Sequence, residues 1–452
     1  MKLSKVYSWL CPACMFLVFC LTACSSTALL AQRGSYLKAY HKGYFTEAEQ
    51  HLNVIASQEI SKHNYTESKN ASWILLDRAT TRFAMGKVEE AIQDYKLALE
   101  SMDYYGQDLL SEQISQILLQ DEIGAYQASD FEQVLTRLYF AFALFHQGDE
   151  SNAYALLRQA EEYQQEKKEI YAQFPFTKNY RLANNTLSNY LFATLLEKRG
   201  DLANAKILYK QAASSLPSEL QPSLDLISKS NQATVLIICH NGKAPYKISD
   251  TQPSSVASAM ALEFLLADQN IDPAFSSLTG IQVPTLQYWP FSTPKTTYAA
   301  INGHFKPLFS LYNINQVAHE ELEQKMPLLV AKGVARHLIR RSAVGYINER
   351  DEKMGQLADL GMWFANTQTR ADTRSWTTLP ASLDLARFDI EAGTHFLTLQ
   401  VKEDPQSVSE KNYSLCLSPQ DLCIIHIFNI QPGINQVLIP QRYLINTQGV
   451  AS

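Results

Sequence analysis

The segment Gly86-Lys87-Val88-Glu89-Glu90-Ala91-Ile92-Gln93-Asp94-Tyr95-Lys96-Leu97-Ala98 decides the fold of the first half of the chain. It places a glycine, a small residue, a large residue and a second small residue at successive spacings of five, four and three positions. Glycine readily adopts the left-handed backbone conformation that ends a helix, and small residues let two helices approach closely. We therefore predict one helix before Gly86 and a second after it, with Tyr95 filling the space beside the pair.

The same pattern recurs between residues 33 and 217, where apolar residues follow a helical period. The further copies are Gly148-Ala153-Leu157-Ala160, Gly200-Ala205-Tyr209-Ala212 and the weaker Gly43-Ala48-Leu52-Ile55. These offsets resemble those of the tetratricopeptide repeat, a 34-residue helical hairpin that stacks into a solenoid. Successive glycines stand 43, 62 and 52 residues apart, so the predicted array is irregular. An unrelated helical bundle is the alternative.

Beyond a polar linker at residues 218–232, the chain changes to short apolar runs that are typical of strands. Asn241-Gly242 follows the first run and predicts a tight hairpin to the next one. The expected strands are 233–239, 246–248, 281–289, 383–388, 394–401, 413–417, 422–430 and 436–439, with a short helix at 254–267.

The second half therefore predicts a β-domain in two parts, residues 233–310 and 371–452, separated by a helical insertion at 311–370. Short strands at this spacing favour an antiparallel, sandwich-like arrangement. The predicted fold class is α+β, with an N-terminal tetratricopeptide-like α-solenoid followed by this antiparallel β-sandwich-like domain.

The start of the chain has the layout of an export signal. Lys2 and Lys5 precede an apolar run, which ends in Leu21-Thr22-Ala23-Cys24. This resembles a bacterial lipoprotein signal, which implies that residues 1–23 are removed, that Cys24 is acylated, as with palmitate, and that residues 24–32 form a tether. Ser25, in place of aspartate, implies the outer membrane, facing the periplasm. The alternative is an ordinary cysteine in a cleaved secretory signal.

The formal charge argues against nucleic acid as a partner, and the cysteine positions limit which disulfide can form. Removal of residues 1–23 with their two lysines changes the formal charge from −6 to −8, and no basic patch points to nucleic acid. Cys11 and Cys14 lie in the removed segment. Cys416 and Cys423 are the expected pair if a disulfide forms in an oxidising periplasm. The alternative is that they and Cys239 are simply core residues.

Two further motifs stand outside the repeats. In the first, Tyr126–Leu135, Asp130 is placed to cap a helix, Phe131 to pack inward and Glu132 to complement the helix N-terminus. In the second, Ala371–Pro380, Arg374 offers a bidentate donor and Trp376 a large face to bury. Either these residues form a binding surface, or they clamp the helical insertion to the β-domain; the local chemistry favours the clamp.

Together with the lipid signal and the repeats, these motifs resemble a family of tetratricopeptide-containing bacterial outer-membrane lipoproteins. The resemblance covers nearly the whole mature chain. The family has no established activity, but in some bacteria its genes lie beside those for lipoprotein activators of peptidoglycan synthases. The resemblance implies a membrane anchor through the lipid, and a periplasmic or outer-membrane protein partner such as a synthase or its activator.

Enzyme motifs are not evident. His319-Glu320-Glu321-Leu322-Glu323 starts like a metalloprotease helix, but Glu323 stands where zinc needs a second histidine. We therefore expect no catalytic residue, metal or cofactor, and predict an interaction scaffold in cell-wall synthesis or envelope maintenance. The alternative is a glycan- or peptidoglycan-binding protein, or an envelope hydrolase, with its site in the β-domain near Arg374.

Overall fold

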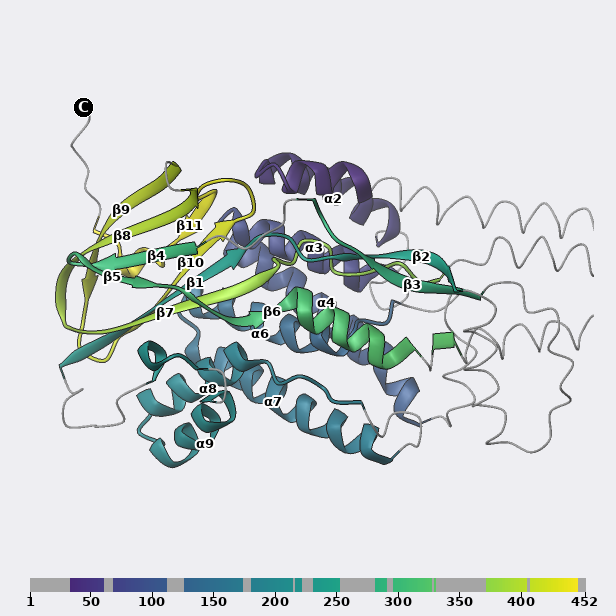
Figure 1. The fold of residues 1–452 in the computed structure, drawn as a ribbon, viewed down its shortest axis with the longest axis horizontal. Helices are drawn as coiled ribbons and strands as arrows, with labels where there is room; N and C mark the ends of the chain where they lie inside the picture. Colours follow the sequence, from purple (N-terminus) through teal and green to yellow (C-terminus); the bar gives the residue numbers. More distant parts are fainter. Residues whose placement is uncertain are drawn as a thin grey trace, which may run out of the picture.

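The computed structural model describes residues 33–60, 68–111, 126–173, 180–213, 216–221, 231–252, 281–290, 296–326, 329–330, 371–404 and 407–445. Helices come first along the chain and strands follow, which confirms an α+β protein (Figure 1). A helix over 33–40 leads into α2 (Phe45–Glu59), α3 (Ala71–Ala84), α4 (Val88–Ser111), α6 (Asp130–Gln147), α7 (Glu150–Gln173), α8 (Thr186–Lys198) and α9 (Leu202–Ala213).

The glycines of the repeated pattern stand at the turns between successive helices, as the sequence predicts. Gly43, Gly86, Gly148 and Gly200 have φ values of 73°, 78°, 100° and 81°, which glycine adopts at little cost. They separate the helix over 33–40 from α2, α3 from α4, α6 from α7, and α8 from α9. Ala91, Tyr95 and Ala98 are completely buried, so the small and large positions pack inward as expected.

Three sheets make up the strand half within the described residues. The five-stranded sheet has the order β11-β10-β1-β7-β6, the four-stranded sheet β5-β4-β8-β9, and a ribbon pairs β2 with β3. The strands are β1 (Gln232–Asn241), β2 (Tyr246–Gln252), β3 (Ile281–Gln287), β4 (Thr296–Ile301), β5 (His304–Pro307), β6 (Phe309–Asn313), β7 (Ser382–Glu391), β8 (Gly393–Asp404), β9 (Ser407–Leu417), β10 (Leu422–Asn429) and β11 (Gln436–Leu438).

Two expectations about strand pairing are wrong. The five-stranded sheet is mixed rather than antiparallel, because β1 and β10 run parallel, with Thr234 opposite Leu422. The hairpin expected at Asn241-Gly242 does not form, although Gly242 does take a positive φ of 72°. Both edges of β1 are already occupied, by β7 and β10, so β2 pairs instead with β3.

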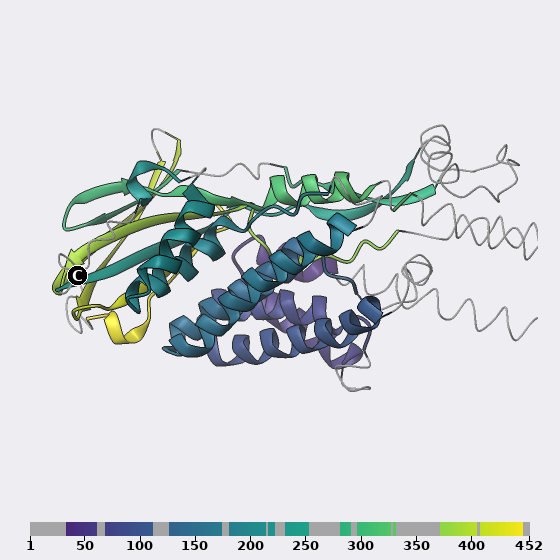
Figure 2. The same ribbon diagram turned by 90° about the horizontal axis from the view of Figure 1, so that it is seen from below.

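The protein is built in three layers. The five-stranded sheet lies in the middle, and the four-stranded sheet packs on one of its faces through an aliphatic core that includes Val235, Ile237 and Leu399. The helices pack on the opposite face, where Leu236, Ile238 and Phe428 share one core with them. The helices gather on one side of the strands in Figure 2, while the β2–β3 ribbon extends away beside a helix over 314–326 (Figure 1).

Residues 435–442 run along the turns of the first three hairpins. A Cβ atom at Gly43 would meet Asn435 at 3.8 Å, and one at Gly86 would meet Leu438 at 3.4 Å. At Gly148, a Cβ atom would lie 2.9 Å from Nη1 of Arg442, whose guanidinium donates to the carbonyls of Phe145 and His146. These contacts join the helical layer to the C-terminal segment.

Several expected segments lie outside the described residues. They are the signal with Cys24, the tether at 24–32, the helix expected at 254–267, residues 222–230 of the linker and residues 331–370 of the helical insertion. The described start of that insertion is helical over 314–326, as expected. The strands β4, β5 and β6 fall in a stretch for which the sequence predicted no strand.

Candidate functional site

The structure brings the two sequence motifs together at the N-terminus of α6. Oε1 of Glu132 accepts from the backbone N–H of Trp376 at 2.8 Å, across 244 residues of sequence. Its other oxygen, Oε2, accepts from the hydroxyl of Tyr126 and the N–H of Ser129, both at 2.7 Å. Glu132 therefore complements the helix start, as predicted, but Ser129 is the capping residue and Asp130 is the first residue of the helix.

Residues 371–380, which we call the strap, are also held by a carboxylate that sequence reasoning missed. Asp77 of α3 is completely buried and accepts five hydrogen bonds. Four come from the N–H and hydroxyl groups of Thr377 and Thr378, at 2.8–2.9 Å, and one from the hydroxyl of Tyr36, at 2.6 Å. Burial raises the pKa of Asp77 to about 6, against the opposing effect of these donors.

Two further strap residues, Trp376 and Arg374, form hydrogen bonds with residues of α3 or with the residue just before it. Trp376 is 1% exposed, and its indole N–H donates to Oγ1 of Thr80 at 3.0 Å. Arg374 makes the predicted bidentate contact with a carboxylate, that of Asp372, and donates to Oδ1 of Asn70 at 3.0 Å. With Trp376 enclosed in this way, the strap is an internal clamp, but it fastens α3 and α6 of the N-terminal helical layer, whereas the sequence predicted a clamp on the helical insertion.

Asp130 lies in a second polar cluster, with Tyr163, Tyr171, Tyr180, Glu321 and Lys325, which we call the Asp130 cluster. Its carboxylate accepts from the three tyrosine hydroxyls at 2.6–3.0 Å and from Nζ of Lys325 at 2.8 Å. Burial alone would raise the pKa of Asp130, but the charges of Lys325 and Lys167 hold it well below its usual range. Burial alone would lower the pKa of Lys325, but the negative charges of Asp130 and Glu321 raise it well above its usual range.

Glu321 explains what the metalloprotease-like segment does in the fold. Its two oxygens accept from the N–H groups of Asp130 and Phe131, at 2.8 and 3.0 Å, so it caps α6 from a distant helix. His319 instead points to Glu323, 3.3 Å away, and both of these side chains are more than half exposed. Phe131 is 8% exposed and packs in the helical core, as predicted.

Two histidines are buried between the helices and the five-stranded sheet. Nε2 of His240 lies 3.1 Å from Nδ1 of His426, and Nδ1 of His240 lies 2.9 Å from the hydroxyl of Tyr139. Burial lowers the pKa of His240 to about 3 and holds that of His426 well below its usual range, so both rings are neutral. Among the residues that the structure describes, no three histidine, cysteine, aspartate or glutamate side chains are arranged to hold a metal ion.

None of the three cysteines in the described residues, Cys239, Cys416 and Cys423, forms a disulfide. Cys239 and Cys423 are buried in the core between the two sheets, while Cys416 is exposed. The disulfide considered between Cys416 and Cys423 is therefore not formed, and for Cys239 and Cys423 the core alternative is correct.

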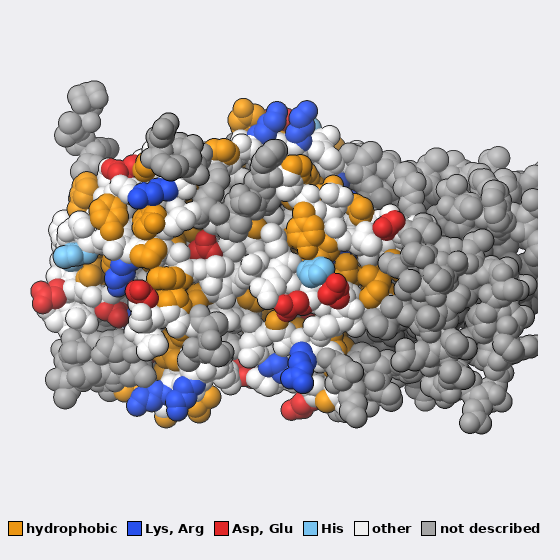
Figure 3. Space-filling view, viewed as in Figure 1, with side chains coloured by type: hydrophobic (Ala, Val, Ile, Leu, Met, Phe, Trp, Pro, Cys, Tyr) orange, Lys and Arg blue, Asp and Glu red, His pale blue; other side chains and the backbone are white. Residues whose placement is uncertain are grey.

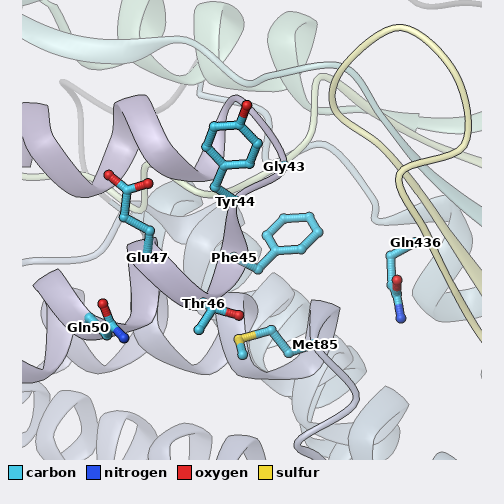
Figure 4. Close-up of a pocket in the computed structure, with 8 residues that line it drawn as sticks. All are labelled: Gly43, Tyr44, Phe45, Thr46, Glu47, Gln50, Met85 and Gln436. Carbon is cyan, nitrogen blue, oxygen red and sulfur yellow. The ribbon is translucent and has the colours of Figure 1, made fainter.

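An open groove lies at the start of α2, on the surface of the helical layer. It has a volume of about 690 Å³ and is lined by Gly43, Tyr44, Phe45, Thr46, Glu47, Gln50, Met85 and Gln436 (Figure 4). Tyr44 is 59% exposed, while its neighbour Phe45 is 8% exposed and forms part of the core. Gln436 belongs to β11, an edge strand of the five-stranded sheet. Apart from Gly43, which belongs to the repeated pattern, these residues carry no signal in the sequence, because the groove joins segments nearly 400 positions apart.

Comparisons with known proteins gave no match: no family model, curated protein or solved structure is similar to this chain. In the parts of the chain that the structure describes, no helix combines the length and apolar character needed to cross a membrane.

Proposed function

We propose that this protein is an outer-membrane lipoprotein that faces the periplasm and acts as an interaction scaffold in peptidoglycan synthesis or envelope maintenance. The lipoprotein signal ending at Cys24 supports the anchor. The helix over 33–40 begins nine positions after Cys24. Its Tyr36 and Tyr40 donate hydrogen bonds to Asp77 and to the carbonyl of Thr378, at 2.6 and 3.0 Å. A short tether would therefore join the lipid directly to the folded core.

The helical layer supports the finer part of this proposal, a divergent tetratricopeptide-like array. Four helix pairs follow one another, each with a positive-φ glycine at its turn. Arrays of this kind bind proteins or peptides on extended surfaces. Here the strap and the sheet cover the side of the helices on which Trp376 and Phe428 are buried, so a partner must use another surface.

The groove at α2 is the single observation that carries the scaffold. It combines an exposed aromatic ring, a thioether, a carboxylate and two amides beside an edge strand. An extended peptide can add to an edge strand through its main chain and place alternate side chains in an adjoining groove. The occupant we propose is an extended segment of a periplasmic or outer-membrane protein, such as a peptidoglycan synthase or its activator.

Site-specific crosslinking in cells tests this proposal. A photoreactive residue replaces Gln50, in the groove, or Ile207, a 55% exposed residue of α9 that serves as the control. We expect a synthase or its activator to be captured at position 50 and not at 207, and the capture to be lost in Cys24→Ala. Tyr44→Ala should weaken the capture, and Ile207→Ala should not. Equal capture at both positions, or none at either, would contradict the scaffold.

A further inference from the structure

The outer face of the four-stranded sheet carries an exposed aromatic surface. Leu397, Leu399 and Val401 of β8 point into the core, so the alternate residues Phe396, Thr398 and Gln400 point outward. Phe305 and Phe396 are each 52% exposed. Figure 3 shows hydrophobic side chains gathered over β4, β5, β8 and β9 on this side of the molecule.

Strand register arranges this face in rows of residues that lie opposite one another. One row runs Phe305, Ala300, Thr398, Asn412, the next runs Pro307, Tyr298, Gln400, Glu410, and Phe396 lies in another row, opposite Ser414. Residues directly opposite in neighbouring strands share a face and lie within side-chain contact. Ala300, in the first row, is only 1% exposed although it faces outward, because larger side chains surround it. We call Tyr298, Phe305, Phe396, Thr398, Gln400, Glu410 and Asn412 the outer platform.

The polar half of the outer platform is already ordered. Oγ1 of Thr398 donates to Oδ1 of Asn412 at 2.8 Å. The carboxylate of Glu410 accepts from the amides of Gln400 and Asn412, at 2.7 and 3.0 Å. These fixed amide and carboxylate groups keep further capacity to donate and accept hydrogen bonds. Ordered groups of this kind bind a ligand at lower entropic cost than mobile ones.

The charged side chains on this face indicate which class of ligand it can bind. Nζ of Lys402 lies 4.7 Å from the centre of the Tyr298 ring, and the negative charge of Glu410 is held by two amides. The two charges are opposite in sign, so the face offers no excess of either for a phosphate backbone or an anionic lipid surface. Flat apolar rings beside amide and carboxylate groups instead match a sugar chain, whose ring faces are apolar and whose edges carry hydroxyl and acetamido groups.

We propose that the outer platform binds an uncharged, N-acetylated glycan chain, with sugar rings stacked on Phe305 and Phe396 and polar edges hydrogen-bonded to Gln400, Glu410 and Asn412. Only the identification of the natural ligand as cell-wall glycan rests on the proposed envelope location. Binding here and protein capture at the α2 groove use separate surfaces, so either can fail without the other.

Binding of the full protein in detergent to chitohexaose, and its sedimentation with isolated sacculi, test the inference. Phe305→Ala with Phe396→Ala should weaken binding of chitohexaose about tenfold or more, a loss of about 1.4 kcal/mol or more, because both stacking surfaces are removed. The thermal midpoint should change little, because both rings are half exposed. Tyr44→Ala, in the groove, is the matched control and should bind like the parent chain.

A third variant and three contrary results complete the test of the outer platform. Gln400→Ala, which removes an amide without removing a ring, should also weaken binding. Sedimentation with sacculi but no binding of chitohexaose would overturn the glycan as ligand, and so would binding that the double variant leaves unchanged. A concentration-dependent dimer that the double variant abolishes would show that this face binds a second copy of the chain instead.

Discussion

The two faces of the five-stranded sheet are buried by different chemistry. The face toward the four-stranded sheet is apolar along most of its length, with Ile237 and Ile425 both completely buried there, and its buried polar side chains at one end, Asn241, Ser382 and Asp384, bond one another within the sheet. The face toward the helices has an apolar core too, but it also carries Arg387, His240 and His426. Apolar contact between the sheets stabilises without specifying one arrangement in detail. On the other face, Arg387 bonds Glu197 and Tyr209, and His240 bonds Tyr139, so these two side chains fix how the helical layer sits on the sheet.

The largest difference between the faces should appear at Arg387. This side chain is 3% exposed and bonds Glu197 of α8 at 3.0 Å, and Tyr209 of α9 at 2.9 Å. Arg387→Met would leave Glu197 buried without its charge partner, so we expect the free energy of unfolding to fall by about 3–5 kcal/mol. Denaturant unfolding of the full chain, followed by circular dichroism, measures this loss.

An exposed pair of the same residue types provides the control. Arg158 and Glu162 are about 60% exposed and lie 3.2 Å apart, so Arg158→Met should cost less than about 1 kcal/mol. Adding Glu197→Leu to Arg387→Met should recover much of the loss, because the buried carboxylate of Glu197 is then gone, and Asp389, the other partner of Arg387, is 24% exposed and still accepts from Thr234. Equal costs for the Arg387 and Arg158 variants would show that the polar contacts of the helix-facing side do not hold the layers together.

A smaller effect should come from the two buried histidines, and it depends on pH. Burial lowers the pKa of His240 from an ordinary value of 6.5 to about 3, and it holds the pKa of His426 well below that ordinary value. The unfolded chain therefore takes up protons first, so their contribution to stability is complete above about pH 6.5 and falls as the solution is acidified. Between pH 6.5 and 5.5, each histidine should cost about 1 kcal/mol.

Unfolding measured at several pH values checks this dependence. His426→Phe places an apolar ring among Phe83 and Phe142, and it should reduce the slope between pH 6.5 and 5.5 by the share of one histidine. Ile424→Val changes the same strand without removing a titratable group and should leave the slope of the parent chain unchanged. An unchanged slope in His426→Phe would mean that this ring does not link acid to the stability of the helix–sheet contact.

The sequence predicts the hairpins better than the sheet, because hairpins depend on local spacing. Gly86, Ala91 and Tyr95 lie within ten residues and act within one helix pair. Pairing of β1 with β10 is instead decided between segments that are nearly 190 residues apart. The Asn241-Gly242 signal marks the end of β1 at a positive-φ glycine, but the predicted hairpin is absent, because β7 and β10 already occupy both edges of β1 and β2 pairs with β3.

In the candidate site too, the sequence shows the local motifs but not the contacts between distant segments. Both motifs around Glu132 and Trp376 stood out in the sequence, yet nothing in the sequence showed that they bond each other. Asp77 could have been found from its place in the apolar run Trp73–Leu76, since a carboxylate on a buried helix face needs partners. The α2 groove and the outer platform had no such signal, because each joins side chains from several elements that only folding brings together.

The smallest predicted effect tests whether the polar groups alone distinguish the two faces. Ile424 and Ile425 are neighbours on β10, but Ile424 packs toward the helices and Ile425 toward the second sheet, at 3% and 0% exposure. Each change to valine removes one buried methylene and should lower the free energy of unfolding by about 1 kcal/mol. If apolar packing is equivalent on both sides, the two costs should agree within the error of denaturant unfolding. A much larger cost for Ile424→Val would show that the helix-facing core is also fitted more closely, and that the faces differ in packing as well as in charge.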